Sequence, residues 1–338
     1  MAKSIWLDPQ HSDEIRDILQ QKGWLGAQEP LLSLTKPGEG NMNLVLRVQT
    51  PSRTFILKQA RPWVEKYPQI PAPIERLSVE HKFYRTAARK KSLAELMPAV
   101  IGYDKKYNLL LTEDLGKGAD YTHLYRTGAS IATSEIQALG HFLTQLHRRK
   151  LAPRELQRYP ENRTLRLLNH EHIFNFPYSN DTGFDLDTIQ IGLQEAAQSF
   201  RKDGTLLKKV KELGNIYLSK GATLLHGDYY PGSWLKVAQG VRIIDPEFSF
   251  LGPAEFDAGV MMGHVMLSHL PAQQQAAFWN AYSPAPGFDT GLAAAFAGTE
   301  MLRRIIGLAQ LPLQRELSER KQLLEKGRAL VLGQEKLA

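Results

Sequence analysis

The stretch HGDYYPGSWLKVAQGVRIIDPEF, residues 226–248, carries two acidic loops on either side of a predicted β-hairpin. Asp228 follows a short apolar run, and Asp245 comes 17 positions later, directly after the second arm of the hairpin. Apolar residues on both arms and the turn Ala238-Gln239-Gly240 between them are typical of a hairpin. The pattern predicts that the two acidic loops meet at one end of a small sheet.

Two acidic loops at one place suit phosphoryl transfer. This reaction needs one carboxylate to orient and deprotonate the attacking hydroxyl, and others to hold Mg²⁺ against the phosphates of ATP. Asp245 and Glu247 offer the hard oxygen ligands that Mg²⁺ prefers. We therefore expect Asp228 to be the catalytic base and Asp245 and Glu247 to be metal ligands. The alternative for Asp228 is a plain turn residue after a strand.

The chain before residue 116 predicts a small β-sheet with a helix. Short apolar runs alternate there with turn residues, and a first helix candidate near the N-terminus stops at Gly23. The predicted strands cover residues 31–35, 43–49, 54–59 and 108–112, and the predicted helix covers residues 74–88.

Helical patterns dominate from residue 116 onward, apart from the island around the two acidic loops. They cover, among others, residues 258–270, 293–308 and 316–333. This change of rhythm predicts an α+β fold with two domains. Residues 1–115 would form a small β-sheet lobe, and residues 116–338 a mainly helical lobe.

Residues 226–233 followed by Asp-Pro-Glu-Phe at 245–248 resemble the catalytic loop and metal motif of the aminoglycoside phosphotransferase and choline kinase superfamily. The Asp-Pro-Glu-Phe form is similar in particular to the methylthioribose kinases. Three more segments agree with that family in order, at residues 38–43, 56–60 and 300–304. The resemblance covers about residues 30–310 and implies a protein-kinase-like bilobal fold.

The resemblance also implies which residues bind ATP. Glycines let backbone amides approach phosphate oxygens, and Lys58 would contact the α- and β-phosphates. Glu80 is the expected ion-pair partner of Lys58, with Glu75 as the rival. The segment from Glu113 to Leu115 would hydrogen-bond adenine through its backbone. The implied phosphate-loop residues are Gly38, Gly40, Asn41 and Asn43.

Arg303 and Arg304 would contact the sugar or the transferring phosphoryl group, a task that suits the planar guanidinium fork. The alternative is a solvated helix face. Ser233 stands where most family members carry Asn and would be a weaker metal ligand. Three further residues are expected to be structural: His226 as a brace of the catalytic loop, Asp257 as its anchor, and His264 as a core histidine.

One departure from the family concerns the acceptor. Tyr229 and Tyr230 replace the usual Leu-His pair, so a residue close to the nucleophile has changed character. The leading prediction is phosphorylation of 5-methylthioribose at its anomeric hydroxyl, with ATP and Mg²⁺. The alternatives are another sugar, an amino alcohol or an aminoglycoside as acceptor, or a nucleotide-binding pseudokinase. Intact Lys58, Asp228, Asp245 and Glu247 count against the pseudokinase.

The composition restricts which partners and which covalent cross-links the chain can have. The 338 residues carry 42 Lys and Arg against 35 Asp and Glu, a net charge of +7 that suits an anionic substrate. No aromatic residues interleave with the basic runs, so we expect no nucleic acid partner. The absence of cysteine excludes disulfides and fits a reducing compartment. We expect a cytoplasmic protein that takes a small-molecule acceptor, needs no membrane, and could form a homodimer.

Overall fold

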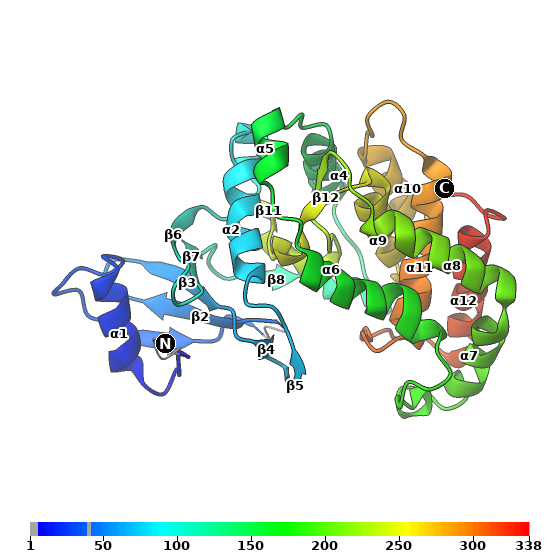
Figure 1. Cartoon of the computed structure of the whole chain (residues 1–338), viewed down its shortest axis with the longest axis horizontal. Helices are drawn as coiled ribbons and strands as arrows, with labels where there is room; N and C mark the ends of the chain where they lie inside the picture. The colour runs from blue at the N-terminus through cyan, green and yellow to red at the C-terminus, as the bar shows by residue number, and fades with distance from the viewer. Residues whose placement is uncertain (1–5, 39–41, 338) are drawn as a thin grey trace. The chain divides into compact units, whose positions relative to one another are not determined.

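The computed structural model describes residues 6–38 and 42–337 (Figure 1). The chain divides into two compact units. The first consists of Met1–Gly118 together with Ile244–Phe248, and the second of Ala119–Ile243 and Ser249–Ala338. The division at residue 115 remains a prediction, but the segment 244–248, which it assigned to the helical lobe, groups with the first unit.

A five-stranded antiparallel sheet forms the centre of the first unit, with strand order β1-β2-β3-β7-β6. The predicted meander is confirmed, whereas β6 and the hairpin β4–β5 were not predicted. The elements of this unit are α1 (Ser12–Gln21), β1 (Ser33–Thr35), β2 (Leu44–Gln49), β3 (Thr54–Gln59), β4 (Trp63–Val64), β5 (Tyr67–Pro71), α2 (Arg76–Ala87), α3 (Lys91–Ala94), β6 (Val100–Asp104) and β7 (Leu109–Glu113).

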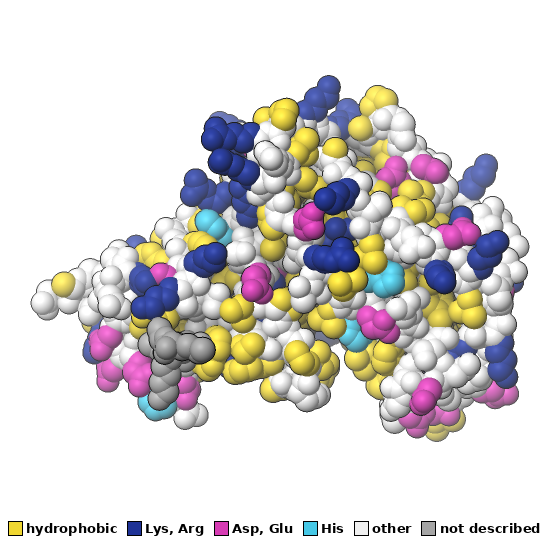
Figure 2. Space-filling view, viewed as in Figure 1, with side chains coloured by type: hydrophobic (Ala, Val, Ile, Leu, Met, Phe, Trp, Pro, Cys, Tyr) yellow, Lys and Arg dark blue, Asp and Glu magenta, His cyan; other side chains and the backbone are white. Residues whose placement is uncertain are grey.

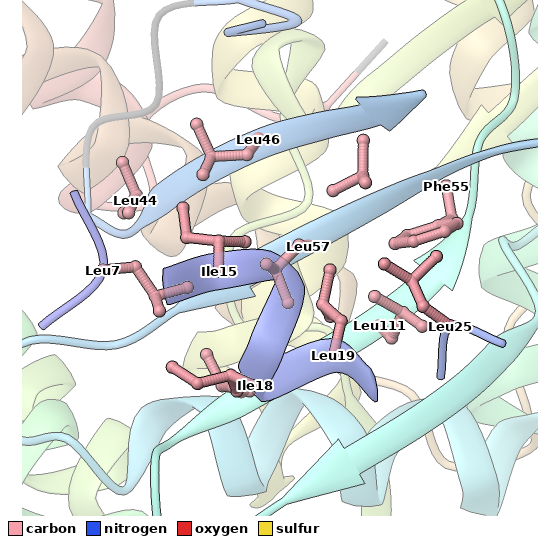
Figure 3. Packing of buried hydrophobic residues seen from close by; sticks show 12 residues of the cluster. Leu7, Ile15, Ile18, Leu19, Leu25, Leu44, Leu46, Phe55, Leu57 and Leu111 are labelled. Carbon is pink, nitrogen blue, oxygen red and sulfur yellow. The ribbon is translucent and has the colours of Figure 1, made fainter. Parts of the chain in front are cut away.

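Helix α1 covers one face of this sheet. Its apolar stripe of Ile15, Ile18 and Leu19 is buried against alternate residues of the central strands, including Leu57 (Figure 3). Successive side chains of a strand point to opposite faces. Lys58 therefore points to the face of the sheet opposite α1.

The second unit is mainly helical, so the predicted α+β fold, with an N-terminal sheet and a helical remainder, is confirmed. Its helices are α4 (Thr133–His147), α5 (Pro153–Arg158), α6 (Arg163–His170), α7 (Leu193–Lys202), α8 (Gly204–Leu218), α9 (Ala254–Leu267), α10 (Ala272–Ala281), α11 (Thr290–Ile306) and α12 (Leu317–Val331). Its strands are β8 (Ala119–Asp120), β9 (Thr223–Leu225), β10 (Trp234–Val237), β11 (Gly240–Ile243) and β12 (Phe250–Gly252).

The predicted hairpin exists as β10–β11, but the expectation that both acidic loops end one sheet is wrong. Strand β9, which precedes Asp228, pairs with β12 and not with the hairpin, whose other neighbour is β8. Strand β9 pairs with residues of β12 that lie 25 or more positions later in the chain. Local sequence patterns do not predict pairing over such a distance.

Glycines bring α9 and α11 together in the core of the second unit. A Cβ on Gly259 would lie 2.5 Å from the Cβ of Phe296, and one on Gly263 would lie 2.8 Å from the carbonyl oxygen of Ala297. Only glycine allows the two helices this close approach. The contact places the polar residues of both helices within hydrogen-bond distance of each other.

No helix within the described ranges is long and apolar enough to cross a membrane. Figure 2 shows Lys and Arg side chains gathered most densely at the upper left of that view and more scattered elsewhere, among acidic and apolar side chains.

Candidate active site

Lys58 is the centre of the charged cluster in the first unit. Its Nζ lies 2.7 Å from Oε1 of Glu80 and also contacts Oδ1 of Asp245. Glu80, and not Glu75, is thus the ion-pair partner, because Glu75 is the N-cap residue of α2 whereas Glu80 is buried within the helix. Burial alone would lower the pKa of Lys58, but the carboxylates of Asp245 and Glu80 hold it well above its usual value.

Asp245 has an unusual backbone conformation. Its φ of 62° lies in the left-handed region, which is unfavourable for a residue with a Cβ. Strain of this kind clusters at functional sites. The amide of Asp245 donates to the hydroxyl of Tyr84 at 3.3 Å, and 46% of its side chain is exposed. The segment thus presents one carboxylate that is both held by Lys58 and accessible.

Glu247 is held differently, because it is buried. Its Oε2 accepts a hydrogen bond from Nδ2 of Asn43 at 2.8 Å and lies 3.5 Å from Nε of Arg76. Burial raises the pKa of Glu247 to about 7, although Arg76 opposes this increase. Asn43, predicted near the phosphates of ATP, therefore links the end of the predicted phosphate loop to the Asp-Pro-Glu segment.

Arg76 was missed by the sequence analysis. It is fully buried, and its Nε donates to Oδ1 of Asn43 at 2.8 Å. A cation in the first turn of a helix opposes the helix dipole, and this unfavourable position was a signal of a special role. Its remaining nitrogens donate to backbone carbonyls of Met42, Arg61, Trp63 and Pro73.

The other residues predicted to bind nucleotide are only partly described. Gly40 and Asn41 lie outside the described residues, and Gly38 is an exposed bend. The amide of Glu113 donates to the carbonyl of Ala99 at 2.8 Å, so this N–H is used within the sheet. Leu115 is half-buried directly after β7.

Asp114, between Glu113 and Leu115, is fixed by a bidentate ion pair. Nε and Nη2 of Arg47 lie 2.8 and 3.0 Å from its two carboxylate oxygens. Nη2 of Arg47 also donates to the carbonyl of Gly116 at 2.8 Å. Two parallel bonds of this kind define geometry as well as energy, so the backbone after β7 is held in one conformation.

In the second unit, Asp257 anchors the loop that carries Asp228. Its two carboxylate oxygens accept hydrogen bonds from the amides of His226 and Gly227, at 2.6 and 2.9 Å. Gly227 has a φ of 86°, which glycine adopts without strain. The amide of Asp228 donates to Nδ1 of His226 at 3.3 Å. The expected structural roles of Asp257 and His226 therefore agree with the geometry.

Ser233 is buried in the short turn η5 (Pro231–Ser233). Its hydroxyl donates to the carbonyl oxygen of Asp228 at 2.9 Å. The proton of this hydroxyl therefore braces the loop, and only the lone pairs of the oxygen could serve a cation.

The carboxylate of Asp228 faces two guanidinium groups. Nη2 of Arg303 lies 3.9 Å and Nη2 of Arg304 lies 3.7 Å from its Oδ1, within ion-pair distance but beyond hydrogen-bond distance. The solvated-face alternative is wrong for both arginines, whose side chains are 5 and 9% exposed. Burial raises the pKa of Asp228 to about 6, although Arg304 and Arg303 oppose the increase.

Glu300 holds both arginines from the same helix. Its Oε2 accepts from Nε of Arg303 at 2.6 Å, and its Oε1 accepts from Nε of Arg304 at 2.8 Å. His264, from α9, contributes a third bond, with Nε2 2.7 Å from Oε1 of Glu300. The expectation of a satisfied core histidine is confirmed, since its Nδ1 lies 2.6 Å from the hydroxyl of Tyr125.

The two tyrosines after Asp228 lie in different environments. Tyr229 is part of the core: it is buried, and its hydroxyl donates to the carbonyl of Leu139 at 2.9 Å. Tyr230 is half-buried, and its ring centre lies 5.0 Å from the guanidinium carbon of Arg304. A Cβ on Gly232 would lie 2.4 Å from this ring. Of the pair, Tyr230 is therefore the residue that lies next to Arg304.

The residues predicted to bind Mg²⁺ include two carboxylates that lie two positions apart in the chain. Asp245 supplies a half-exposed carboxylate on strained backbone, and Glu247 a buried one two residues later. Among residues 6–38 and 42–337, no three His, Asp or Glu side chains gather into a metal-binding group. Mg²⁺ retains several waters and commonly takes one or two carboxylates besides substrate phosphates. The residues fit such a cation.

A family model agrees with this arrangement. The model described as "Phosphotransferase enzyme family" matches residues 33–295. Two curated relatives have the name methylthioribose kinase. The one from Exiguobacterium sibiricum is 27% identical, over 94% of this chain and 91% of its own. The one from Pectobacterium carotovorum is 28% identical, over 94% and 92%.

Solved structures share the fold at low sequence identity. Spectinomycin phosphotransferase, crystallised with ADP and spectinomycin, aligns with a TM-score of 0.55 at 13% identity, over 94% of this chain and 97% of its own. The choline kinase of Streptococcus pneumoniae aligns with a TM-score of 0.50 at 14% identity, over 95% and 99%. Both alignments support the kinase-like fold of the whole chain.

Proposed function

Because the chain belongs to the phosphotransferase enzyme family, we propose that it transfers the γ-phosphoryl group of ATP to 5-methylthioribose, at the anomeric hydroxyl. The observation that carries the proposal is the position of Asp228 opposite the paired guanidinium groups of Arg303 and Arg304. The likeness to methylthioribose kinases over more than nine-tenths of this chain supports the choice of acceptor.

Asp228 acts as the base in this proposal. The acceptor hydroxyl gives its proton to the carboxylate, and its oxygen attacks the γ-phosphorus. The bond from that phosphorus to the β–γ bridging oxygen breaks, and ADP leaves with the electron pair. The raised pKa of Asp228 suits the role, because a base is most effective when its pKa lies close to the working pH.

Arg303 and Arg304 stabilise the negative charge that spreads over the phosphoryl oxygens during transfer. Buried guanidinium groups are effective here because they are held in place before the reaction and are weakly screened by water. Their terminal nitrogens lie too far from Asp228 to hydrogen-bond it strongly, so the base keeps its capacity to accept a proton.

Lys58 binds the α- and β-phosphates, with Glu80 holding its ammonium group in position. Gly38 and Asn43 are the described residues proposed to lie near the phosphates, whereas Gly40 and Asn41 of the same predicted loop lie outside the described residues. The carbonyl of Glu113 and the amide of Leu115 bind adenine, since the amide of Glu113 is used by Ala99. Arg47 stabilises this segment through its pair with Asp114.

Asp245 and Glu247 are the proposed ligands of Mg²⁺, and Ser233 is a further candidate. The ion, when bound, would neutralise charge on the phosphates and on the leaving ADP. Asp245 is the better-placed ligand, because its carboxylate is half-exposed whereas that of Glu247 is buried against Asn43 and Arg76.

A different acceptor is the second candidate, and Tyr230 is the observation that favours it. Its ring lies against the guanidinium of Arg304, in space that a side chain at position 232 would occupy. An aromatic wall at this position could select another sugar or an amino alcohol. The cytoplasmic location and the homodimer remain predictions.

A panel of acceptors distinguishes these proposals. The purified chain is incubated with Mg²⁺ and ATP and with 5-methylthioribose, ribose, choline, homoserine or an aminoglycoside, and acceptor-dependent ADP release is measured. We expect the highest kcat/KM with 5-methylthioribose. A higher value with another acceptor would shift the assignment to that compound, and no turnover with any acceptor would favour the pseudokinase.

A further inference from the structure

Glu300 is the single acidic residue of helix α11, and it is buried. Residues 293–306 of α11 are all buried, and Glu300 is 1% exposed. A buried carboxylate is costly unless hydrogen bonds and opposite charges compensate it. Burial alone would raise the pKa of Glu300, but the charges of Arg303 and Arg304 hold it well below its usual value. It is therefore ionised.

The spacing along the helix explains how one carboxylate serves two arginines. Residues three and four positions after Glu300 lie on the same face of an α-helix. Arg303 and Arg304 occupy these two positions, and each gives its Nε to a different oxygen of Glu300. Both guanidinium groups are thus held through Nε, and Nη2 of each lies within ion-pair distance of Oδ1 of Asp228, at 3.9 and 3.7 Å.

His264 fixes Glu300 from the neighbouring helix. An ionised carboxylate can only accept hydrogen bonds, so Nε2 of His264 must carry the proton. Its Nδ1 is then an acceptor, and the hydroxyl of Tyr125 donates to it. The close approach of α9 at Gly263, where a Cβ would lie 3.0 Å from the Cβ of Glu300, brings the imidazole within reach.

We propose that Glu300 is a positioning residue for the transfer reaction. It holds both guanidinium groups by their inner nitrogens and so directs their outer nitrogens to the place where the phosphoryl group meets the acceptor. His264 and Tyr125 keep Glu300 in that orientation. The inference rests on the proposed function, since it assigns Arg303 and Arg304 to the reacting phosphoryl group.

Glu300→Asp is the main test, because it keeps the charge but shortens the side chain by one methylene group. An aspartate cannot reach both Nε atoms. We expect kcat to fall by roughly 10- to 100-fold while the KM for ATP changes less than about threefold, as for a residue that acts in the transition state. A role in charge balance alone predicts kcat near that of the wild type, and that result would overturn the proposal.

Thr299→Val is the matched control. Thr299 is equally buried on the same helix, and its hydroxyl only donates to the carbonyl of Ala295 one turn earlier. We expect wild-type kcat. Tyr125→Phe is a milder variant that keeps the fold, and it should lower kcat by roughly three- to tenfold through His264. Equal losses in the Thr299 and Glu300 variants would mean a general packing effect and would overturn the proposal.

A double-mutant cycle separates positioning from an independent role. If Glu300 acts only through the arginines, adding Glu300→Gln to the Arg303→Met/Arg304→Met variant should not lower kcat further. It should raise the melting temperature, because it removes a buried carboxylate that has lost both ion-pair partners. A multiplicative loss of kcat would contradict the proposal.

Binding of inorganic phosphate without nucleotide, measured by titration calorimetry, tests the arginines independently of turnover. We expect phosphate to bind Glu300→Asp at least about fivefold more weakly than the wild type and Thr299→Val. Equal affinities, or no binding to the wild type, would overturn the proposal. Phosphate could bind Glu300→Asp more weakly than the wild type and Thr299→Val while the wild type phosphorylates none of the acceptors. That result would refute only the proposed function.

Discussion

Asp228 combines two opposing influences on one carboxylate. Burial favours its protonated form and raises its pKa to about 6, while Arg304 and Arg303 favour the ionised form. The backbone is held equally firmly, through the amides that bind Asp257 and the carbonyl that accepts from Ser233. These properties suit the proposed role of Asp228 as the base near neutral pH, because neither arginine lies within hydrogen-bond distance of its carboxylate.

We predict that Asp228→Asn lowers kcat by a factor on the order of 10² to 10⁴, the range for loss of a positioned base. Asn keeps the shape of the side chain but cannot accept the proton. The KM for ATP should stay within about threefold of the wild type, because ATP is assigned to the residues around Lys58. Steady-state kinetics with varied ATP checks this, and parallel losses in nucleotide affinity and kcat would contradict the role.

The pH dependence of kcat/KM should report the ionisation of the Asp228 carboxyl. Because the carboxylate accepts a proton only when it is ionised, kcat/KM should fall about tenfold per pH unit below pH ~6. Arg304→Met removes a charge that lowers this pKa, so its acid limb should move to higher pH. A profile of the wild type that stays flat down to pH 5 would assign the base to another group.

The two arginines should not tolerate lysine. Arg303→Lys and Arg304→Lys should each keep only part of the wild-type kcat, because an ammonium group lacks the fork that binds two oxygens and the Nε that binds Glu300. Methionine at either position should cost several kcal/mol of transition-state stabilisation, roughly as for loss of an arginine finger. Four variants with unchanged kinetics would remove the pair from the site.

At the scale of elements, α2 organises the first unit. Glu80 and Arg76 lie four positions apart on one face of this helix, and each holds one end of the Asp-Pro-Glu segment. Glu80 acts through Lys58 on Asp245, and Arg76 contacts Glu247 directly. These ion pairs hold the carboxylates of Asp245 and Glu247 beside helix α2.

Arg76→Met should therefore destabilise the protein strongly. It leaves Glu247 buried without its cationic partner, and breaking a buried pair from one side costs about 3–5 kcal/mol. Arg85→Met, at an exposed position of the same helix, should change the free energy of unfolding by less than about 0.5 kcal/mol. Urea unfolding of both variants checks the difference. Equal free energies of unfolding would show that the buried contact between Arg76 and Glu247 does not stabilise the protein.

Sequence patterns predicted the elements whose residues repeat locally. The period-two strands β2 and β3 and the apolar helices α9 and α11 appear close to their expected positions. The hairpin β4–β5 was missed because β4 has two residues and Pro68 and Pro71 interrupt the strand pattern of β5. The pairing of β9 with β12 was missed because it depends on packing between distant segments.

The candidate site was predicted in part for the same reason. Motif residues such as Lys58 and Asp228 stand out locally, whereas Arg76 acquires its partners only through tertiary contacts. Glu300 carried an unused signal: it is the single acid in an apolar helical run, followed at the third and fourth positions by arginine. Buried acids of this kind need nearby cations.

In the chain as a whole, the proposed metal ligands Asp245 and Glu247 belong to the first unit, and the proposed base Asp228 and the further candidate ligand Ser233 belong to the second. Residues 244–248 group with the sheet unit, although the segments on both sides of them belong to the helical unit. The residues proposed to bind the nucleotide therefore belong to the first unit, whereas Asp228, Arg303 and Arg304 belong to the second.

The two proposed metal ligands should differ in what they contribute. Asp245→Asn should raise the Mg²⁺ concentration for half-maximal activity by roughly tenfold or more, with little change in stability, because its carboxylate is half-exposed. Glu247→Gln should affect stability more, because its carboxylate is buried against Arg76. Mg²⁺ titrations and urea unfolding of both variants test this difference. If both variants keep the Mg²⁺ dependence of the wild type, Asp245 and Glu247 are not metal ligands.

The proposed reaction is phosphorylation of the anomeric hydroxyl of 5-methylthioribose. Phosphorus NMR of a reaction with Mg²⁺, ATP and 5-methylthioribose tests it most directly, because the splitting of the product signal identifies the proton on the carbon that bears the phosphate. We predict a new phosphomonoester signal coupled to the anomeric proton, formed in equal amount with ADP and at least about 10²-fold more slowly with Asp228→Asn. A signal coupled to protons of another carbon, or ADP and free phosphate alone, would contradict the account.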